Sequence, residues 1–168
     1  MIKCNETFSD IVEVWPFAEG KIAYTVPFNV RSRTLKLADL GVESLEQLLL
    51  DKSFYTIGDV GEDSLGVEME ERQTNLKSTT KFSSGGRSFD ISLTLIINEK
   101  SIKSANMMDE LESTRHDFLL KCADGDYLFV RSAEMSYRCI VEEEIADSYQ
   151  QKLSISFENY NGIQRFIV

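Results

Sequence analysis

Two stretches in the second half of the chain alternate between apolar and polar residues. Residues 88–97 (SFDISLTLII) and residues 152–159 (KLSISFEN) both follow this pattern. Because successive side chains of a strand point to opposite faces, the pattern predicts strands with one buried and one solvated face. Such strands are typical of antiparallel sheets. The residues expected on the buried face are Phe89, Ile91, Leu93, Leu95 and Ile97 in the first stretch, and Leu153, Ile155 and Phe157 in the second.

Two other stretches have the spacing of amphipathic helices. Residues 101–115 carry apolar residues at helical intervals between charged ones: Ile102, Ala105, Met107, Met108 and Leu111. Residues 44–50 open with Ser44, and Gln47 lies at capping-box spacing from it. Their inward-facing residues are Val42, Leu45, Leu48 and Leu49. We therefore expect a mainly β, α+β fold: an antiparallel β-sandwich or barrel with these two helices.

Residues 115–132 (RHDFLLKCADGDYLFVRS) contain two short β-prone runs separated by Asp124 and Gly125. An Asp-Gly pair favours a two-residue type I′ turn, which predicts a β-hairpin here. This register sets Cys122 opposite Tyr127, Leu120 opposite Phe129, and Phe118 opposite Arg131. Both faces then carry apolar side chains. The hairpin should be covered on both sides, or form a wall between the core and a subunit contact.

The first half of the chain gives weaker signals. Residues 20–30 and 53–60 resemble strands, and Pro27 would end the first or place it at an edge. From residue 58 to 87 the chain is polar, and residues 76–88 predict a flexible arm or hairpin loop that orders against a neighbouring subunit. The candidate assembly surface on this arm consists of Leu76, Thr79, Thr80, Phe82, Gly85 and Gly86. At 168 residues, 1–168 is expected to form a single domain.

Composition and charge exclude several classes of protein. The formal net charge is −10, from 28 acidic and 18 basic residues, which opposes sequence-specific nucleic-acid binding. No apolar stretch approaches the roughly 20 residues of a membrane span, so we expect a soluble protein with no membrane partner. The N-terminal MIKCNETFSD lacks the pattern of a secretory signal, and Cys4, Cys122 and Cys139 are odd in number and widely spaced. These features favour free thiols and a bacterial cytoplasmic location.

The only histidine, His116, limits the catalytic chemistry that can be considered. A metal-dependent hydrolase would use His116 with Asp124 and Asp126, since carboxylates and imidazole are the usual ligands. However, an Asp-Gly-Asp run is also what a tight turn requires, and a histidine after a helix commonly caps its last carbonyls. No glycine-rich stretch has phosphate-binding spacing. We therefore expect no enzyme activity, no metal site and no cofactor. A monomeric β-sandwich binding module is a further alternative.

Residues 87–165 resemble tail structural proteins of phages and prophages, of the tail-tube or distal-tail type, from Bacteroides-like bacteria. The stretches that carry the resemblance are RHDFLL, the Asp-Gly turn and SFENYNGI. The resemblance implies a tail-tube-like fold and a virion structural protein that assembles with itself into rings, hexameric in such tails, and docks with other tail proteins. Glu142, Glu143 and Glu144 would then line an acidic lumen that repels DNA.

Overall fold

The computed structural model describes residues 11–27, 32–52, 55–58, 66–67, 69, 74–83, 85–132, 136–145 and 149–168. The described chain is mainly β, as predicted. Two α-helices are present in it, α1 (Leu45–Lys52) and α2 (Ile102–Ser113), with a 3-10 helix at Leu37–Leu40. The strands are β1 (Ile11–Ala18), β2 (Thr34–Lys36), β3 (Thr56–Gly58), β4 (Gly66–Val67), β5 (Asn75–Ser83), β6 (Gly86–Ile97), β7 (His116–Cys122), β8 (Tyr127–Val130), β9 (Arg138–Ile145), β10 (Tyr149–Asn159) and β11 (Gln164–Ile167).

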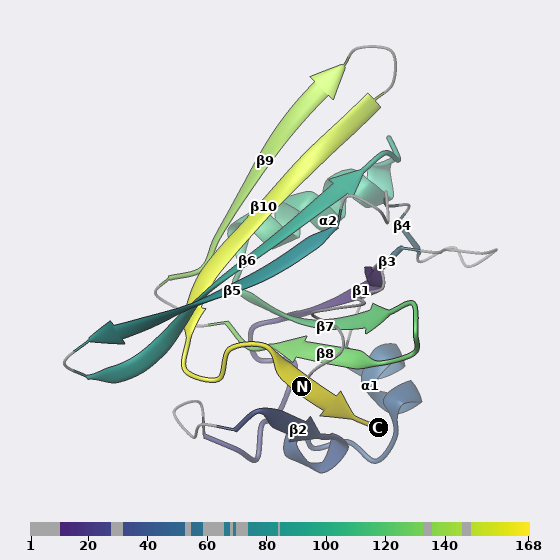
Figure 1. The fold of residues 1–168 in the computed structure, drawn as a ribbon. Coiled ribbons are helices and arrows are strands. Elements are labelled where there is room, and N and C mark those ends of the chain that lie inside the picture. Colours follow the sequence, from purple (N-terminus) through teal and green to yellow (C-terminus); the bar gives the residue numbers. More distant parts are fainter. Residues whose placement is uncertain are drawn as a thin grey trace.

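The strands form two open sheets. One has four strands in the order β5-β6-β10-β9, and every neighbouring pair is antiparallel. The other has seven strands in the order β2-β11-β8-β7-β1-β3-β4, with parallel pairing at β2–β11 and β3–β4. Figure 1 shows the long strands of the four-stranded sheet crossing the molecule, with α2 beside them. The β9–β10 end of this sheet extends upward in that view, and the β5–β6 end extends to the lower left.

Two apolar clusters lie on opposite faces of the seven-stranded sheet. The larger one joins β6, β10 and α2 to β1, β7 and β8, and includes Leu93, Leu111, Phe118 and Ile155. The smaller one packs Trp15, Phe129 and Leu119 of the sheet against residues of α1 and the 3-10 helix. Full burial of such side chains stabilises the fold by about 1.5–3 kcal/mol each. The alternation predicted at 88–97 and 152–159 is confirmed, because the buried-face residues are all below a tenth exposed.

The β7–β8 hairpin exists, but its predicted register is wrong by one residue. Phe118 faces Val130, Leu120 faces Leu128, and Lys121 faces Tyr127. The loop has three residues rather than two: the Gly125 N–H donates to the Cys122 carbonyl over 3.0 Å, and the Cys122 N–H donates to the Asp126 carbonyl over 2.8 Å. Gly125 has φ +95°, the left-handed residue that closes this type of turn. Coverage of both faces of the hairpin by apolar residues is confirmed.

Helix α2 occupies the predicted position, but its buried stripe is shifted. Ser104, Met107, Met108 and Leu111 face the core, whereas Ile102 is 81% exposed and Ala105 is also exposed. A polar residue fits the buried stripe because the Ser104 hydroxyl donates to backbone carbonyls, 2.9 Å from that of Glu99. Its backbone N–H donates to the Ser101 hydroxyl over 3.1 Å, which caps the helix.

Helix α1 follows the predicted cap, with the Gln47 N–H donating to the Ser44 hydroxyl over 3.1 Å. Val42 and Leu48 are buried, and Leu45 and Leu49 pack against the same cluster. The strand predicted at 20–30 is wrong over 20–27, where the chain forms turns and bends, and 28–30 lie outside the described residues. Of 53–60, the described part yields only the short strand β3. No helix in these described ranges is long and apolar enough to cross a membrane.

The arm predicted at 76–88 is part of the β5–β6 hairpin. Residues 75–83 pair with residues 94–86 in continuous antiparallel register within the same chain. Most of β5 is solvent-exposed, and Phe82 near the turn is 82% exposed. The hairpin is therefore held by its backbone ladder and by Leu76, which packs against the larger cluster.

Candidate functional site

The three residues of the hydrolase alternative do not converge. His116 begins β7, is 3% exposed, and its Nδ1 lies 2.7 Å from the Thr114 carbonyl, to which it donates. Asp124 lies in the turn beyond the other end of the strand, where its carboxylate accepts from the Asp126 N–H over 3.1 Å. The seven residues of β7 span about 20 Å, which separates His116 at the start of the strand from Asp124 beyond its end. Within the described residues, no group of three His, Cys, Asp or Glu side chains is arranged to hold a metal ion.

A buried polar cluster surrounds Asp117, which sequence reasoning missed. Its carboxylate accepts from the Ser132 N–H over 2.7 Å and from the Tyr24 hydroxyl, and the Ser132 hydroxyl lies 2.9 Å away. Arg115 Nη1 lies 3.7 Å from the same carboxylate. Burial raises the pKa of Asp117, and these donors oppose that shift. Burial also raises the pKa of Tyr24, with the nearby Asp117 carboxylate adding to the shift.

This cluster attaches the loop after β1 to the β7–β8 hairpin. The Arg131 guanidinium lies 3.7 Å from the centre of the Tyr24 ring and donates to the Val26 carbonyl over 2.9 Å. Serine, histidine and aspartate are adjacent here, but they do not form a catalytic triad. The Ser132 hydroxyl contacts Asp117 and the backbone carbonyl of His116, not the imidazole. The geometry therefore indicates a structural role.

The outer face of the four-stranded sheet is mostly polar, with Ile96 and the half-exposed Ile140 as its apolar residues. Its central rows are rich in hydroxyls, with Ser92 paired to Ser156 and Thr94 paired to Ser154. Charged residues flank them: Lys77, Lys81, Asp90, Arg138, Glu142, Glu144, Lys152 and Glu158. Lys81 Nζ lies 3.3 Å from Glu158 and 3.4 Å from Asp90. Hydrogen bonds to Glu158 and Asp90 raise the pKa of Lys81. The face carries both signs of charge in balance.

A groove of about 630 Å³ lies at the β9 end of this sheet. Residues of β6, β9 and β10 line it, among them Thr94, Glu142, Glu144 and Lys152. Lys152 is directly opposite Glu142 in the ladder, so part of the acidic charge is offset within the subunit. Strand alternation places Glu142 and Glu144 on the outer face, and Glu143 points to the other side. All three glutamates predicted for the lumen are exposed.

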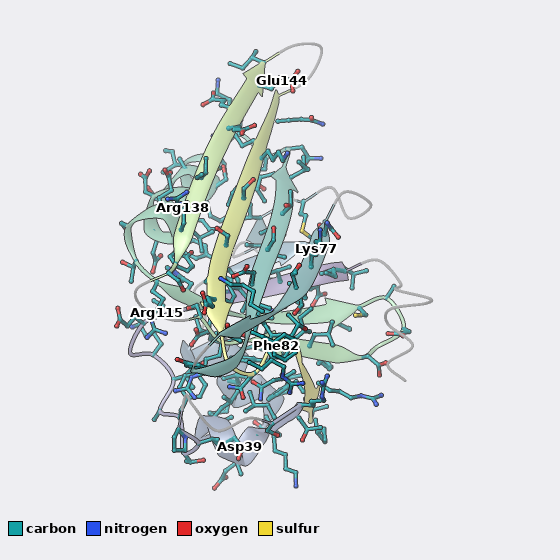
Figure 2. All side chains as sticks on the ribbon, turned by 60° about the vertical axis from the view of Figure 1, so that its left-hand side comes forward. Asp39, Lys77, Phe82, Arg115, Arg138 and Glu144 are labelled. Atoms are coloured by element: carbon teal, nitrogen blue, oxygen red, sulfur yellow. The ribbon has the colours of Figure 1, made fainter. Side chains whose placement is uncertain are left out.

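The outer strands β5 and β9 leave two edges of the sheet unpaired in the described chain. Figure 2 shows Lys77 and Phe82 on one edge and Arg138 and Glu144 on the other. Each edge carries an exposed apolar residue on the side that faces the core: Phe82 on β5 and Ile145 on β9, the latter 72% exposed. Unpaired edges with exposed apolar residues are sites at which another strand can add.

The predicted assembly residues are distributed along the β5 edge. Thr79, Thr80 and Phe82 are exposed on β5, and Gly85 and Gly86 form the exposed turn. Leu76 is half-buried against the core. On the opposite edge, β9, the glutamate triplet was the feature that the sequence singled out. Nothing in the sequence pattern predicted that Ile145 would be exposed there.

Cys139 on β9 is not a reactive thiol. Burial raises its pKa to about 12, and Glu112 adds to the shift, so the thiolate is absent at neutral pH. Cys122 is completely buried. Both are free cysteines.

The chain matches no protein-family model, no curated protein and no solved structure.

Proposed function

We propose that this chain is a non-enzymatic structural subunit of a phage or prophage-derived tail, which assembles into rings through the edges of its four-stranded sheet. The observation that supports the proposal best is the pair of open edges, β5 and β9, with Phe82 and Ile145 exposed on them. Each edge offers unpaired backbone groups together with an apolar side chain. Pairing with the edge of a second copy would give these backbone groups hydrogen-bond partners and would cover the apolar side chain.

The even number of strands makes such pairing regular. In the order β5-β6-β10-β9 every neighbour is antiparallel, so β9 of one copy runs antiparallel to β5 of the next. Repetition of this head-to-tail contact gives a ring if the rotation between copies closes. The other face of the sheet packs on the core, so its polar outer face would line the ring interior or the ring exterior.

We place the outer face toward the lumen. A hydroxyl-rich surface with balanced charges offers few fixed cations to phosphate groups, so DNA could pass without being held. This surface is less acidic than the glutamate triplet alone suggests, because basic side chains such as Lys81 and Lys152 offset carboxylates on it. A sandwich of the two sheets in the tail-tube arrangement belongs to the same proposal.

Light scattering coupled to size exclusion, over a range of protein concentrations, tests the proposal. Rings in negative-stain images of the same fractions, with a mass that is a fixed multiple of the subunit, would support it. A monomer at every concentration contradicts it. Calorimetric titration with Mg²⁺, Ca²⁺, Mn²⁺ and Zn²⁺ tests the hydrolase alternative, and the absence of binding heat would count against that alternative.

A further inference from the structure

The two outer strands of the four-stranded sheet are offset from one another. Ladder pairing sets Asn75, Thr94, Ser154 and Ile140 in one row across the sheet, and Lys77, Ser92, Ser156 and Arg138 in another. These rows show that the two outer strands do not overlap along their full lengths. At one end of the sheet β9 continues to Ile145 beyond the start of β5, and at the other end β5 continues past Phe82 beyond the start of β9. Figure 2 shows the same offset, with Glu144 and Phe82 at opposite ends of the sheet.

We propose that β9 of one copy pairs with β5 of the next in a single register, with Ile145 opposite Leu76 and Glu144 opposite Lys77. This inference rests on the proposed function and specifies its interface. In this register each of the eight residues of β9 faces one residue of 76–83. No residue of β9 is left without a partner.

The tilt of strands in a closed sheet supports this register. Four strands spaced about 4.8 Å apart span about 19 Å, and a tilt of about 35–45° shifts neighbouring copies by about 13–19 Å along the strands. That shift corresponds to about four to six residues at about 3.4 Å per residue. Only an even shift keeps the polar faces on the same side. A shift in the opposite sense removes all overlap between β9 and β5.

Charge decides between the two even shifts. A shift of four residues sets Lys81 opposite Arg138, and like charges directly opposite each other destabilise a strand pair. Both shifts set Lys77 opposite a glutamate, Glu142 in the shift of four and Glu144 in the shift of six. The shift of six sets Lys81 opposite Ile140 instead, with Glu142 and Arg138 as its two diagonal neighbours. An opposite-charge pair contributes roughly 0.2–1 kcal/mol, so the Lys77 pair supports both shifts equally, and only the Lys81–Arg138 repulsion separates them. The shift of six is therefore favoured.

The core-facing side of the two edges supports the same register. A shift of six sets Ile145 opposite Leu76 and Phe82 opposite Cys139, whose neighbour Val141 then faces Thr80. Phe82 and Ile145 are 82% and 72% exposed in the isolated subunit, and both gain apolar neighbours in this pairing. Cys139 is half-buried and its thiol is protonated, so it acts as a small apolar partner.

Intermolecular disulfide formation tests the register. In a Cys4→Ser, Cys139→Ser background, the Leu76→Cys and Ile145→Cys variants are mixed and oxidised gently in assembled fractions. Directly opposite positions bring Cβ atoms within reach of a disulfide, whereas positions two residues away do not. The matched controls pair Ile145→Cys with Thr74→Cys, which is opposite in the four-residue shift, or with Ser78→Cys. We expect the Leu76→Cys mixture to give about five times more cross-linked dimer than either control.

A charge exchange provides a second readout that does not depend on cysteine chemistry. Lys77→Glu should weaken assembly, and adding Glu144→Lys to the same chain should restore it. Equal cross-linking at positions 74, 76 and 78, or a double variant that assembles no better than Lys77→Glu, overturns this register while the proposed function stands. A parent protein that stays monomeric at every concentration overturns both.

Discussion

Replacement of Tyr24 by phenylalanine would remove one donor from the buried Asp117 carboxylate and leave the rest of the cluster in place. The ring would still lie under the Arg131 guanidinium, 3.7 Å from its centre, and would keep its edge contact with Phe129. The backbone N–H and the hydroxyl of Ser132 would still donate to Asp117. The change therefore tests one hydrogen bond to a charged group.

The expected cost follows from the state of that carboxylate. Hydrogen bonds to charged groups contribute about 1.5–3 kcal/mol, so Tyr24→Phe should lower the free energy of unfolding by about 2 kcal/mol at pH 7. The pKa of Asp117 is raised by burial, and loss of the Tyr24 donor, which favours the charged form, raises it further. The cost should consequently be largest at neutral pH and should shrink as pH falls through the folded-state pKa of Asp117.

Urea unfolding at pH 7 and at a lower pH measures this difference. Tyr127→Phe is the matched control, because the Tyr127 ring packs on Trp15 and its hydroxyl makes no hydrogen bond in the part of the chain that the structure describes. We expect Tyr127→Phe to change the free energy of unfolding by less than about 0.5 kcal/mol, as is usual for substitutions away from buried contacts. A Tyr24→Phe variant that matches this control at pH 7, or whose cost grows as pH falls, would refute the reasoning.

Three further predictions concern other parts of the molecule. Burial lowers the pKa of His116, so stability should fall as pH drops below about 6.5, and His116→Gln should flatten that part of a pH series of urea unfolding curves. Gly58→Ala should destabilise the fold by about 2–4 kcal/mol in thermal or urea unfolding. Gly58 has φ +136°, and an added Cβ would lie 2.1 Å from the Val12 carbonyl oxygen. Phe82→Ser should change subunit stability by less than about 0.5 kcal/mol yet lower the assembled fraction in light scattering.

Secondary structure and burial are predicted best from the sequence where one face of an element packs on the core and the other face meets solvent. Residues 88–97 satisfy that condition, because β6 lies between the larger cluster and the polar outer face. The hairpin register was harder, since Asp-Gly suits both a two-residue turn and a three-residue turn that ends in a left-handed glycine. Strand β1 was missed because apolar residues lie on both its faces and Pro16 interrupts the pattern. At Pro16 the described strand pairs with β7 but not with β3, so its missing N–H is tolerated there.

The Asp117 cluster could not be predicted from local patterns. Its donors come from Tyr24 and Ser132, which are 93 and 15 residues away in sequence. A lone aspartate at the start of an apolar strand gives no sign of such partners, and exposure at a strand end is the usual expectation for it. Only the tertiary pairing of β7 with β8 and the return of the loop after β1 bring the donors to it.

The charges on the two edges bear on the geometry of the proposed assembly. A two-fold dimer that pairs β5 with β5 along its whole length would set Lys77 opposite Lys81 of its copy, and one that pairs β9 with β9 would leave β5 and its exposed Phe82 uncovered. A head-to-tail contact instead pairs the lysine edge with the glutamate edge and brings Phe82 and Ile145 onto apolar neighbours. Because these two residues project at opposite ends of one sheet, the same chain cannot cover both. In the proposed assembly a repeating contact is therefore favoured over a closed dimer, and a ring is the form of that contact which leaves neither edge of the four-stranded sheet unpaired.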